Sequence, residues 1–340
     1  MHVDTQLEAA LRALDHWPRF RLRLFFEGIV VGILSGTVIS FFRWGLEMGT
    51  VWRQWIYANV LASGGVLLNL SWFGVLLAAA LLLWHLGIYE PNAGGSGIPQ
   101  VKGVILGAIR MRWLRILWVK LIGGIVGIGL GLSLGREGPS IQIGAVTAQG
   151  LSRALGRTRM EERYLITAGA SAGLAAAFNA PLAGVMFALE ELHRNFSGVV
   201  LAPSMAAALL ATMVSRYVFG RAPVFHFGML PPFPLRYMWL VVILGIIIGL
   251  AGVVFNKGLL NIHYFYDLPV FRNNYMRIAF ALCMAGILGY VFPEVLGGGN
   301  DLVNSLYTLP LSLKLFAGLL IGKFLFTLVS YGCGVPGGFS

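Results

Sequence analysis

The sequence predicts an all-α integral membrane protein. Of its 340 residues, 57% are hydrophobic and only 11% are charged, whereas a soluble domain carries about 25% charged residues. Its mean hydropathy is +0.78. A spanning helix needs roughly 20 mostly apolar residues, which disfavours the alternative of one very large soluble core. Four stretches of sufficient length contain no Asp, Glu, Lys or Arg: 54–89, 164–189, 195–215 and 237–256.

The 45 glycines point to a transporter or channel rather than to a simple membrane anchor. Glycine lets membrane helices approach closely and suits broken or re-entrant backbone. Three apolar runs, 28–42, 121–135 and 302–313, are too short to span a bilayer upright. Short, glycine-interrupted apolar segments of this kind also point to a transporter or channel.

The net charge of +11 comes from basic clusters that flank apolar segments. In a soluble protein such clusters would suggest nucleic acid, but between apolar segments they indicate cytoplasmic loops, and no nucleic-acid partner is expected. We expect residues 1–23 to form a cytoplasmic helix or tail, either amphipathic on the lipid surface or fully solvated. The basic clusters are Arg19, Arg21 and Arg23; Arg110, Arg112, Arg115 and Lys120; and Arg153, Arg157, Arg159 and Arg163.

Internal repeats divide the remainder of the chain. Three sequence elements recur in the same order at offsets of 202, 217 and 200 residues, as when Gly95 and Gly97 return as Gly297 and Gly299. Repeated halves are typical of transporters, with the substrate site near the midplane. We expect a first membrane repeat over 24–220, a proline-rich linker over 221–234 and a second, incomplete repeat over 235–340.

The segment Gly94-Gly-Ser-Gly-Ile-Pro99 predicts an irregular turn that feeds a new helix. The start of such a helix presents free backbone N–H groups and the positive end of the helix dipole, to which Ser96 adds a hydroxyl donor. At membrane depth these groups form an anion site without a full positive charge. The alternative is an ordinary capping turn in a loop.

A second break, Gly135-Arg-Glu-Gly-Pro139, places the carboxylate of Glu137 in an otherwise apolar region. Carboxylates inside a membrane are costly and mark functional sites. Glu137 at a helix start can itself occupy an anion site, and it becomes neutral and can leave when protonated. The alternative is a surface loop that pairs Glu137 with Arg136.

A third segment, Phe178-Asn-Ala-Pro-Leu-Ala-Gly184, leads into an apolar helix that carries Glu190 and Glu191. On these residues alone we prefer a solvated helix end beside His193 and Arg194. A Gly-x-Ser-x-Gly match at 169–173 is rejected as a nucleophile elbow, because it lies in a helical, small-residue segment without a preceding strand. We therefore expect no enzyme, no metal and no organic cofactor.

Together, Gly-Ser-Gly-Ile-Pro (95–99), Gly-Arg-Glu-Gly-Pro (135–139), residues 178–184 with Glu190 and Glu191, and Gly297-Gly-Gly299 resemble the CLC family of chloride channels and chloride/proton antiporters. The resemblance runs from about residue 24 to the end. It implies a bundle of tilted, partly broken helices in two inverted-topology halves, with homodimeric assembly. It also implies a multi-pass protein of the inner (plasma) membrane with a cytoplasmic N-terminus.

The resemblance assigns roles to individual residues, with chloride and protons as the transported ions. Ser96, with Gly97 and Ile98, resembles the chloride site, and serine rather than proline at 96 suggests chloride over nitrate. Glu137 resembles the gating glutamate. Glu191 resembles the internal proton glutamate, which is typical of exchangers. Gly135, Arg136, Gly138 and Pro139 would shape the gate loop, and Gly338 and Phe339 would complete the chloride site.

Two departures from the family pattern define the alternatives. The Gly-x-Phe-x-Pro motif of the family is incomplete at Gly338–Ser340, and the expected central tyrosine would lie further along, so we expect a C-terminally truncated chain. The leading interpretation is chloride/proton antiport, with a passive chloride channel as the alternative within the family. A fluoride-selective relative is disfavoured by Ser96 and Pro139. The alternative of a different class is a truncated membrane fragment that does not transport.

Overall fold

The computed structural model describes residues 2–194, 196–222, 224, 234–306 and 312–335, with side chains from residue 19 onward. All regular secondary structure in these ranges is helical, as predicted. The chain folds into two compact units. One comprises Met1–Trp44, Ser96–Leu121 and Glu137–Ala222, and the other comprises Gly45–Gly95, Ile122–Arg136 and Pro223–Ser340.

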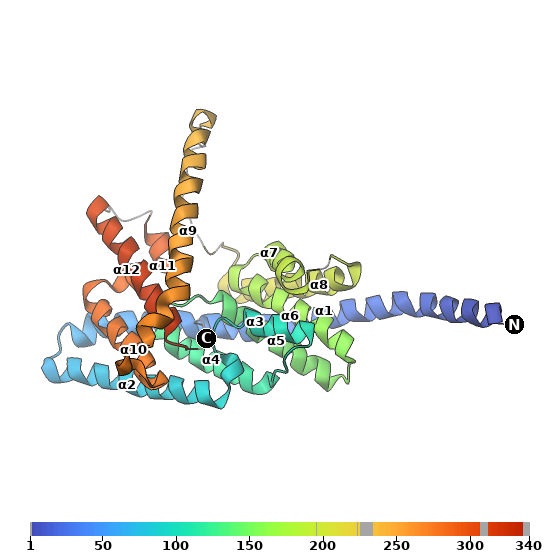
Figure 1. Ribbon diagram of the computed structural model, residues 1–340, viewed down its shortest axis with the longest axis horizontal. Helices are drawn as coiled ribbons and strands as arrows, with labels where there is room; N and C mark the ends of the chain where they lie inside the picture. The colour runs from blue at the N-terminus through green and yellow to red at the C-terminus, as the bar shows by residue number, and fades with distance from the viewer. Residues whose placement is uncertain (1, 195, 223, 225–233, 307–311, 336–340) are drawn as a thin grey trace. The chain divides into compact units, whose positions relative to one another are not determined.

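The first unit is built around α5 and α6, which run side by side (Figure 1). Its further helices are α3, α7, the π-helical turn η3, α8 and the first parts of α1 and α4. The bounds are α1 His2–Trp55, α3 Ile98–Leu106, α4 Trp113–Gly129, α5 Glu137–Ala154, α6 Arg159–Phe178, α7 Pro181–Phe187, η3 Ala188–His193 and α8 Gly198–Phe219.

Glycine residues, which have no side chain, allow α5 and α6 to pack closely. A Cβ placed on Gly144 of α5 would collide with the carbonyl oxygen of Gly169, and one on Gly173 would collide with that of Ser140. Small residues at a crossing let the two backbones approach within van der Waals contact. The Gly-x-Ser-x-Gly match is therefore a helix-packing surface, which confirms the structural interpretation of residues 169–173.

A second glycine ladder joins α1 to α8. Cβ atoms placed on Gly28, Gly32 and Gly36 would lie 2.6, 2.5 and 3.0 Å from the carbonyl oxygens of Pro203, Ala207 and Ala211, respectively. Residues four apart share a helix face, so each glycine meets one turn of α8.

The apolar run 28–42 is part of a longer helix, because α1 continues through Arg43 to Trp55. Arg43 is buried, and its Nη1 donates to the carbonyl oxygen of Ala176 at 3.0 Å and to the hydroxyl of Ser215 at 2.7 Å. These hydrogen bonds hold the guanidinium inside the bundle, so this charge does not mark the end of an apolar segment.

The second unit contains the end of α1, the end of α4 and ten further helices and turns within the described residues. These ten elements are η1 Ile56–Leu61, α2 Val66–Tyr89, η2 Pro91–Ala93, η4 Leu235–Tyr237, α9 Met238–Tyr266, η5 Pro269–Phe271, α10 Asn274–Val291, η6 Pro293–Val295, α11 Asn300–Ser305 and α12 Leu313–Gly332. Helix α10 packs on α2, and α9 packs on α12. Tyr57 donates to the carbonyl oxygen of Gly286 at 2.9 Å and thereby ties η1 to α10.

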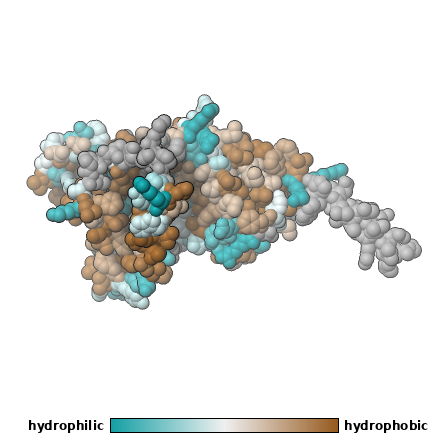
Figure 2. All heavy atoms as spheres, turned by 90° about the horizontal axis from the view of Figure 1, so that it is seen from above, coloured by the Kyte–Doolittle hydropathy of each residue, from teal (hydrophilic) through white to brown (hydrophobic). Residues whose placement is uncertain are grey.

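Six helical segments within the described ranges are long and apolar enough to cross a membrane. Figure 2 shows apolar side chains over much of the visible surface, with polar residues gathered in separate patches. Most apolar side chains of the segment Leu235–Tyr266 are exposed, whereas Tyr266 at its end is buried. The six segments are Arg19–Leu61, Val66–Tyr89, Gly198–Phe219, Leu235–Tyr266, Asn274–Val291 and Leu313–Gly332.

The local backbone repeats at the 202-residue offset. Short 3-10 turns, η2 and η6, each precede two glycines with left-handed φ angles, and a helix follows each pair. Gly95 and Gly97 have φ angles of 66° and 90°, and Gly297 and Gly299 have φ angles of 72° and 87°. The glycine spacing thus reflects a repeated backbone path. The limits of the two membrane repeats, 24–220 and 235–340, and of the linker 221–234 remain predictions.

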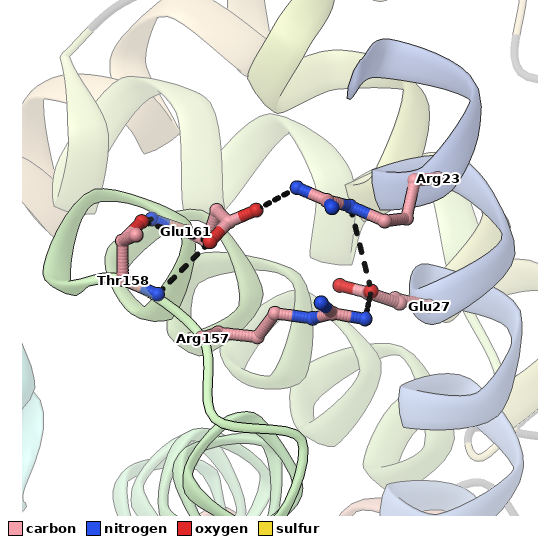
Figure 3. A network of polar contacts seen from close by, with 5 residues as sticks. All are labelled: Arg23, Glu27, Arg157, Thr158 and Glu161. Atoms are coloured by element: carbon pink, nitrogen blue, oxygen red, sulfur yellow. Dashed lines mark hydrogen bonds and ion pairs between the residues drawn. The ribbon is translucent and has the colours of Figure 1, made fainter. Parts of the chain in front are cut away.

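A network of charged residues ties α1 to the turn between α5 and α6 (Figure 3). Arg23 pairs with Glu161 on α6, and Arg157 in the turn lies 2.5 Å from the carboxylate of Glu27 on α1. Thr158 and Glu161 form a reciprocal capping box at the start of α6. Arg23 and Arg157, which belong to two of the basic clusters in the sequence, therefore lie in one network.

Candidate functional site

The first element of the site is the tight turn that starts α3. Gly97 is the N-cap residue, and its φ of 90° is one that L side chains rarely adopt, so glycine is needed here. The backbone N–H of Ile98 donates to the hydroxyl of Ser96 at 3.4 Å. Pro99 in the first helical turn lacks an N–H, where an intrahelical partner would be missing anyway. The predicted turn into a helix is confirmed.

The N-terminus of α5 packs directly against this turn. A Cβ placed on Gly138 would lie 2.9 Å from both the Cα and the Cβ of Ser96. One turn further along α5, the side chain of Gln142 fills the space beside Gly97, with its Cβ 2.7 Å from where a Cβ of Gly97 would be. The starts of two helices, separated by some 40 residues of sequence, thus meet at Ser96.

This arrangement can hold an anion without a lysine or arginine. The first turn of a helix leaves backbone N–H groups without intrahelical partners and carries about half a positive charge. Two such ends converge on Ser96, which adds a half-buried hydroxyl. A halide or a carboxylate fits these donors, and neutral donors release an anion more readily than a fixed cation does.

Glu137 is the first residue of α5. Its carboxylate is exposed, rather than enclosed by apolar side chains as its sequence context suggested, whereas Gly138 and Pro139 beside it are buried. A carboxylate in the first turn is stabilised by the positive end of the helix. Glu137 is therefore attached to the same helix end that an anion at Ser96 would use.

The remaining predicted residues of the gate loop lie before α5, in the second compact unit. Gly135 and Arg136 are half-buried. The backbone N–H of Gly135 donates to the hydroxyl of Tyr331 at 3.3 Å, and that of Ser133 donates to Ser330 at 3.0 Å. Gly338 and Phe339 lie outside the described residues.

Glu191 lies in η3, and Nζ of Lys102 on α3 donates to its Oε1 at 2.7 Å. The hydrogen bond and the positive charge of Lys102 lower the pKa of Glu191, to which Arg194 adds a smaller effect in the same direction. Glu190, the neighbouring acid, is exposed. Of the two adjacent glutamates, the one singled out from the sequence is the one held by a cation.

His193 closes the same turn. Its Nδ1 lies 3.3 Å from the hydroxyl of Thr167, and its ring packs on Tyr164 with centroids 5.6 Å apart. Partial burial lowers the pKa of His193, which favours the neutral ring. Among the described residues, no group of three or more His, Cys, Asp and Glu side chains could hold a metal ion.

The sequence also matches the family described as "Voltage gated chloride channel", whose model covers residues 74–339. This chain belongs to the CLC family. Relatives named H(+)/Cl(-) exchange transporter ClcA share its sequence. The one from Vibrio vulnificus strain YJ016 is 33% identical over 328 residues, with 93% of this chain and 69% of the relative aligned. The one from Salmonella agona is 34% identical over 340 residues, with 96% of this chain and 71% of the relative aligned.

Solved CLC structures share the fold. A slow cyanobacterial Cl−/H+ antiporter superimposes with a TM-score of 0.86 at 32% identity, over 93% of this chain and 75% of the other. A CLC-type fluoride/proton antiporter superimposes with a TM-score of 0.75 at 24% identity, over 93% and 77% of the two chains, which supports the fold alone. This protein is thus a multi-pass CLC membrane protein with the predicted all-α fold.

Sequence reasoning missed two residues that contact members of the candidate site. Lys102 and Gln142 contact Glu191 and Gly97, respectively, yet neither stands in the quoted motifs. The one available signal for Lys102 was its place one helical turn after Ile98, in a segment with no other charge between Glu90 and Arg110.

Lys120 was placed wrongly among the loop charges. It lies within α4, and its side chain is fully buried, unlike the exposed Arg110, Arg112 and Arg115 region before it. A buried lysine of this kind belongs to the interior of the bundle rather than to a solvated loop. It therefore carries no information on the orientation of the chain in the membrane.

Proposed function

We propose that this CLC protein exchanges chloride for protons. The observation that carries the proposal is the sequence identity of 33–34% to transporters named for H+/Cl− exchange, over more than nine-tenths of this chain. The cyanobacterial antiporter that shares its fold at 32% identity gives the same support. Two features of the first unit provide the chemistry: an anion-attracting junction at Ser96 and a carboxylate at Glu191.

On the anion side, chloride binds at the junction of α3 and α5. The Ser96 hydroxyl and the backbone around Gly97 and Ile98 replace part of its hydration shell, and both helix ends attract its charge. In the family pattern, Gly338 and Phe339 supply further backbone donors. The proposal includes no resident cofactor, because the helix ends stabilise the charge of chloride, and chloride and protons are the transported substrates.

On the proton side, Glu137 is the gate and Glu191 the internal proton site. The Glu137 carboxylate competes with chloride for the N-terminus of α5, and protonation removes its charge so that it leaves. Gly135, Arg136, Gly138 and Pro139 set the path of the gate loop. Glu191 receives protons from one side of the membrane and passes them toward Glu137, so that each proton moves against chloride.

We place the protein in the inner (plasma) membrane with its N-terminus in the cytoplasm. The support for orientation is the network of Figure 3, which includes Arg23 of α1 and Arg157 of the α5–α6 turn. Clustered basic residues favour the cytoplasmic side. Contact with membrane lipid and assembly as a homodimer complete the proposal, as the family resemblance implies.

Reconstitution of the purified 340-residue chain in liposomes tests exchange directly. Chloride efflux and internal pH are recorded together, with a chloride gradient as the sole driving force. We expect chloride movement to drive protons uphill. Glu191→Gln should abolish proton movement and spare chloride flux, whereas the matched neighbour variant Glu190→Gln should retain both.

Each other outcome counts against part of the proposal. Chloride flux without protons in the wild-type chain would make the protein a passive channel. Proton movement that survives Glu191→Gln would remove Glu191 from the pathway. The absence of any flux from protein shown to be inserted would refute transport by this chain.

A further inference from the structure

We propose that Lys102 is a positioning residue that holds Glu191 in its ionised state and ties the proton site to the helix that binds the anion. This inference rests on the proposed function, because it takes Glu191 as the internal proton site. It goes beyond that function by assigning a role to a residue outside all the motifs.

The geometry is that of a charge-assisted hydrogen bond between two elements. Nζ of Lys102 lies 2.7 Å from Oε1 of Glu191, although the two residues are 89 positions apart in the sequence. The Lys102 side chain is 25% exposed and that of Glu191 47% exposed, so water reaches the carboxylate. A proton can therefore arrive from solvent without passing through the interior of the bundle.

Lys102 also belongs to the short helix that begins at the anion site. It follows Ile98 by four residues, which is about 6 Å along α3. Helix α3 contacts η3, and the ion pair lies in the middle of α3, one turn after the start of the helix at Ile98. A change at Glu191 acts on the element whose N-terminus would hold chloride.

Among the described charged groups around η3, Lys102 is the cation in direct contact with Glu191. Arg194 acts on Glu191 more weakly than Lys102 does. Helix α6 contributes Tyr164 and Thr167, which contact His193 instead. Helix α7 has no ionisable side chain, and the arginine of α8, Arg216, bonds to Asn179. The ionisable residues of η3 itself are Glu190, Glu191 and His193.

Protonation of Glu191 breaks its ion pair with Lys102. A proton from cytoplasmic water binds the carboxylate, the acid becomes neutral, and Lys102 keeps its charge but loses its ionic partner. The cation therefore disfavours proton loading, and it couples each loading event to the loss of a tie between η3 and α3. A proton and an anion are in this way linked through one helix.

The test is the pH profile of proton transport, with Lys102→Gln, Lys102→Glu and Lys102→Arg in the full chain. Loss of the cation makes Glu191 bind protons more readily. Proton-coupled transport should therefore persist to higher pH in Lys102→Gln and to still higher pH in Lys102→Glu. Lys102→Arg should restore the wild-type profile. Arg112→Gln, which removes an exposed cation in the same unit, should leave the profile unchanged.

A double substitution separates this inference from the proposed function. With Glu191→Gln in place, Lys102→Gln should cause no further change in the pH profile of chloride flux, because residues that act as a unit are not additive. If Glu191→Gln abolishes proton movement but Lys102→Gln leaves the profile in place, the role of Lys102 is refuted and the exchanger stands. If Glu191→Gln itself leaves proton movement intact, the proposed proton site fails first.

Discussion

Substitution of Gly97 by alanine should damage the anion-binding turn far more than the same change at Gly107. Both glycines cap α3 with left-handed φ angles, 90° at Gly97 and 82° at Gly107, so each alanine incurs a backbone penalty of about 1–2 kcal/mol. At Gly97 the new Cβ would also lie 2.7 Å from both Cβ and Cδ of Gln142, well inside normal contact. Overpacking of this kind costs about 1–3 kcal/mol more.

At Gly107 the nearest atom, 2.6 Å away, is Nη2 of Arg163, the far end of a flexible side chain that can move. We therefore expect a loss of about 2–5 kcal/mol for Gly97→Ala and about 1–2 kcal/mol for Gly107→Ala. Denaturant unfolding in detergent, followed by the fluorescence of the nine tryptophans, measures the difference. Chloride efflux should fall in Gly97→Ala because the clash displaces the turn beside Ser96.

Relief of the clash provides the decisive comparison. Gln142→Gly removes the atoms that the new Cβ would meet, so the double variant should lose less stability than the two single variants predict together. Equal losses at Gly97 and Gly107, or strict additivity with Gln142→Gly, would refute the packing argument.

Three further predictions concern the first unit. Thr158→Ala should destabilise the protein by about 1 kcal/mol, measured by unfolding in detergent, because α6 loses its capping hydroxyl, while Thr158→Ser should retain it. Partial burial by itself raises the pKa of Glu161, but hydrogen bonds from Thr158 and the charges of Arg23 and Arg157 outweigh it and lower that pKa below 4.5. The contribution of the ionised Glu161 to stability is thus complete above pH 4.5 and is lost as the pH falls through the lowered pKa. A series of melting temperatures from pH 7 to 3 should show this loss of stability. Glu161→Gln should flatten the dependence of melting temperature on pH. Gly32→Leu should destabilise by at least 1–3 kcal/mol through its contact with α8, whereas Gly252→Leu, where a Cβ meets no described atom within 4 Å, should change unfolding little.

The elements that local chemistry dictates were predictable. Charge-free runs indicated three of the six membrane-length segments, Val66–Tyr89, Gly198–Phe219 and Leu235–Tyr266, and the glycine and proline positions at 94–99 indicated the turn into α3. The small residues at 169–173 identified a tight helix contact. Each of these depends on the conformational and steric properties of residues close together in the chain.

The charged residues inside the bundle were not predictable in the same way. Arg43 and Lys120 interrupt apolar runs, which resembles a helix end in sequence, but both side chains are buried. The exposure of Glu137 and the pairing of Lys102 with Glu191 depend on which helices become neighbours. Such contacts join residues many positions apart, and no periodicity within one segment encodes them.

The backbone path at 91–99 is repeated at 293–301, although the side chains at matching positions differ. The first copy has the serine hydroxyl at 96 and proline at 99, whereas the second has Gly298 and Asp301 in these places. An acid in the first helical turn repels the ion that the serine copy would attract. In the second copy a cation holds the loop instead, because Nζ of Lys323 donates to the carbonyl oxygens of Val295 and Gly297 at 2.9 and 2.6 Å.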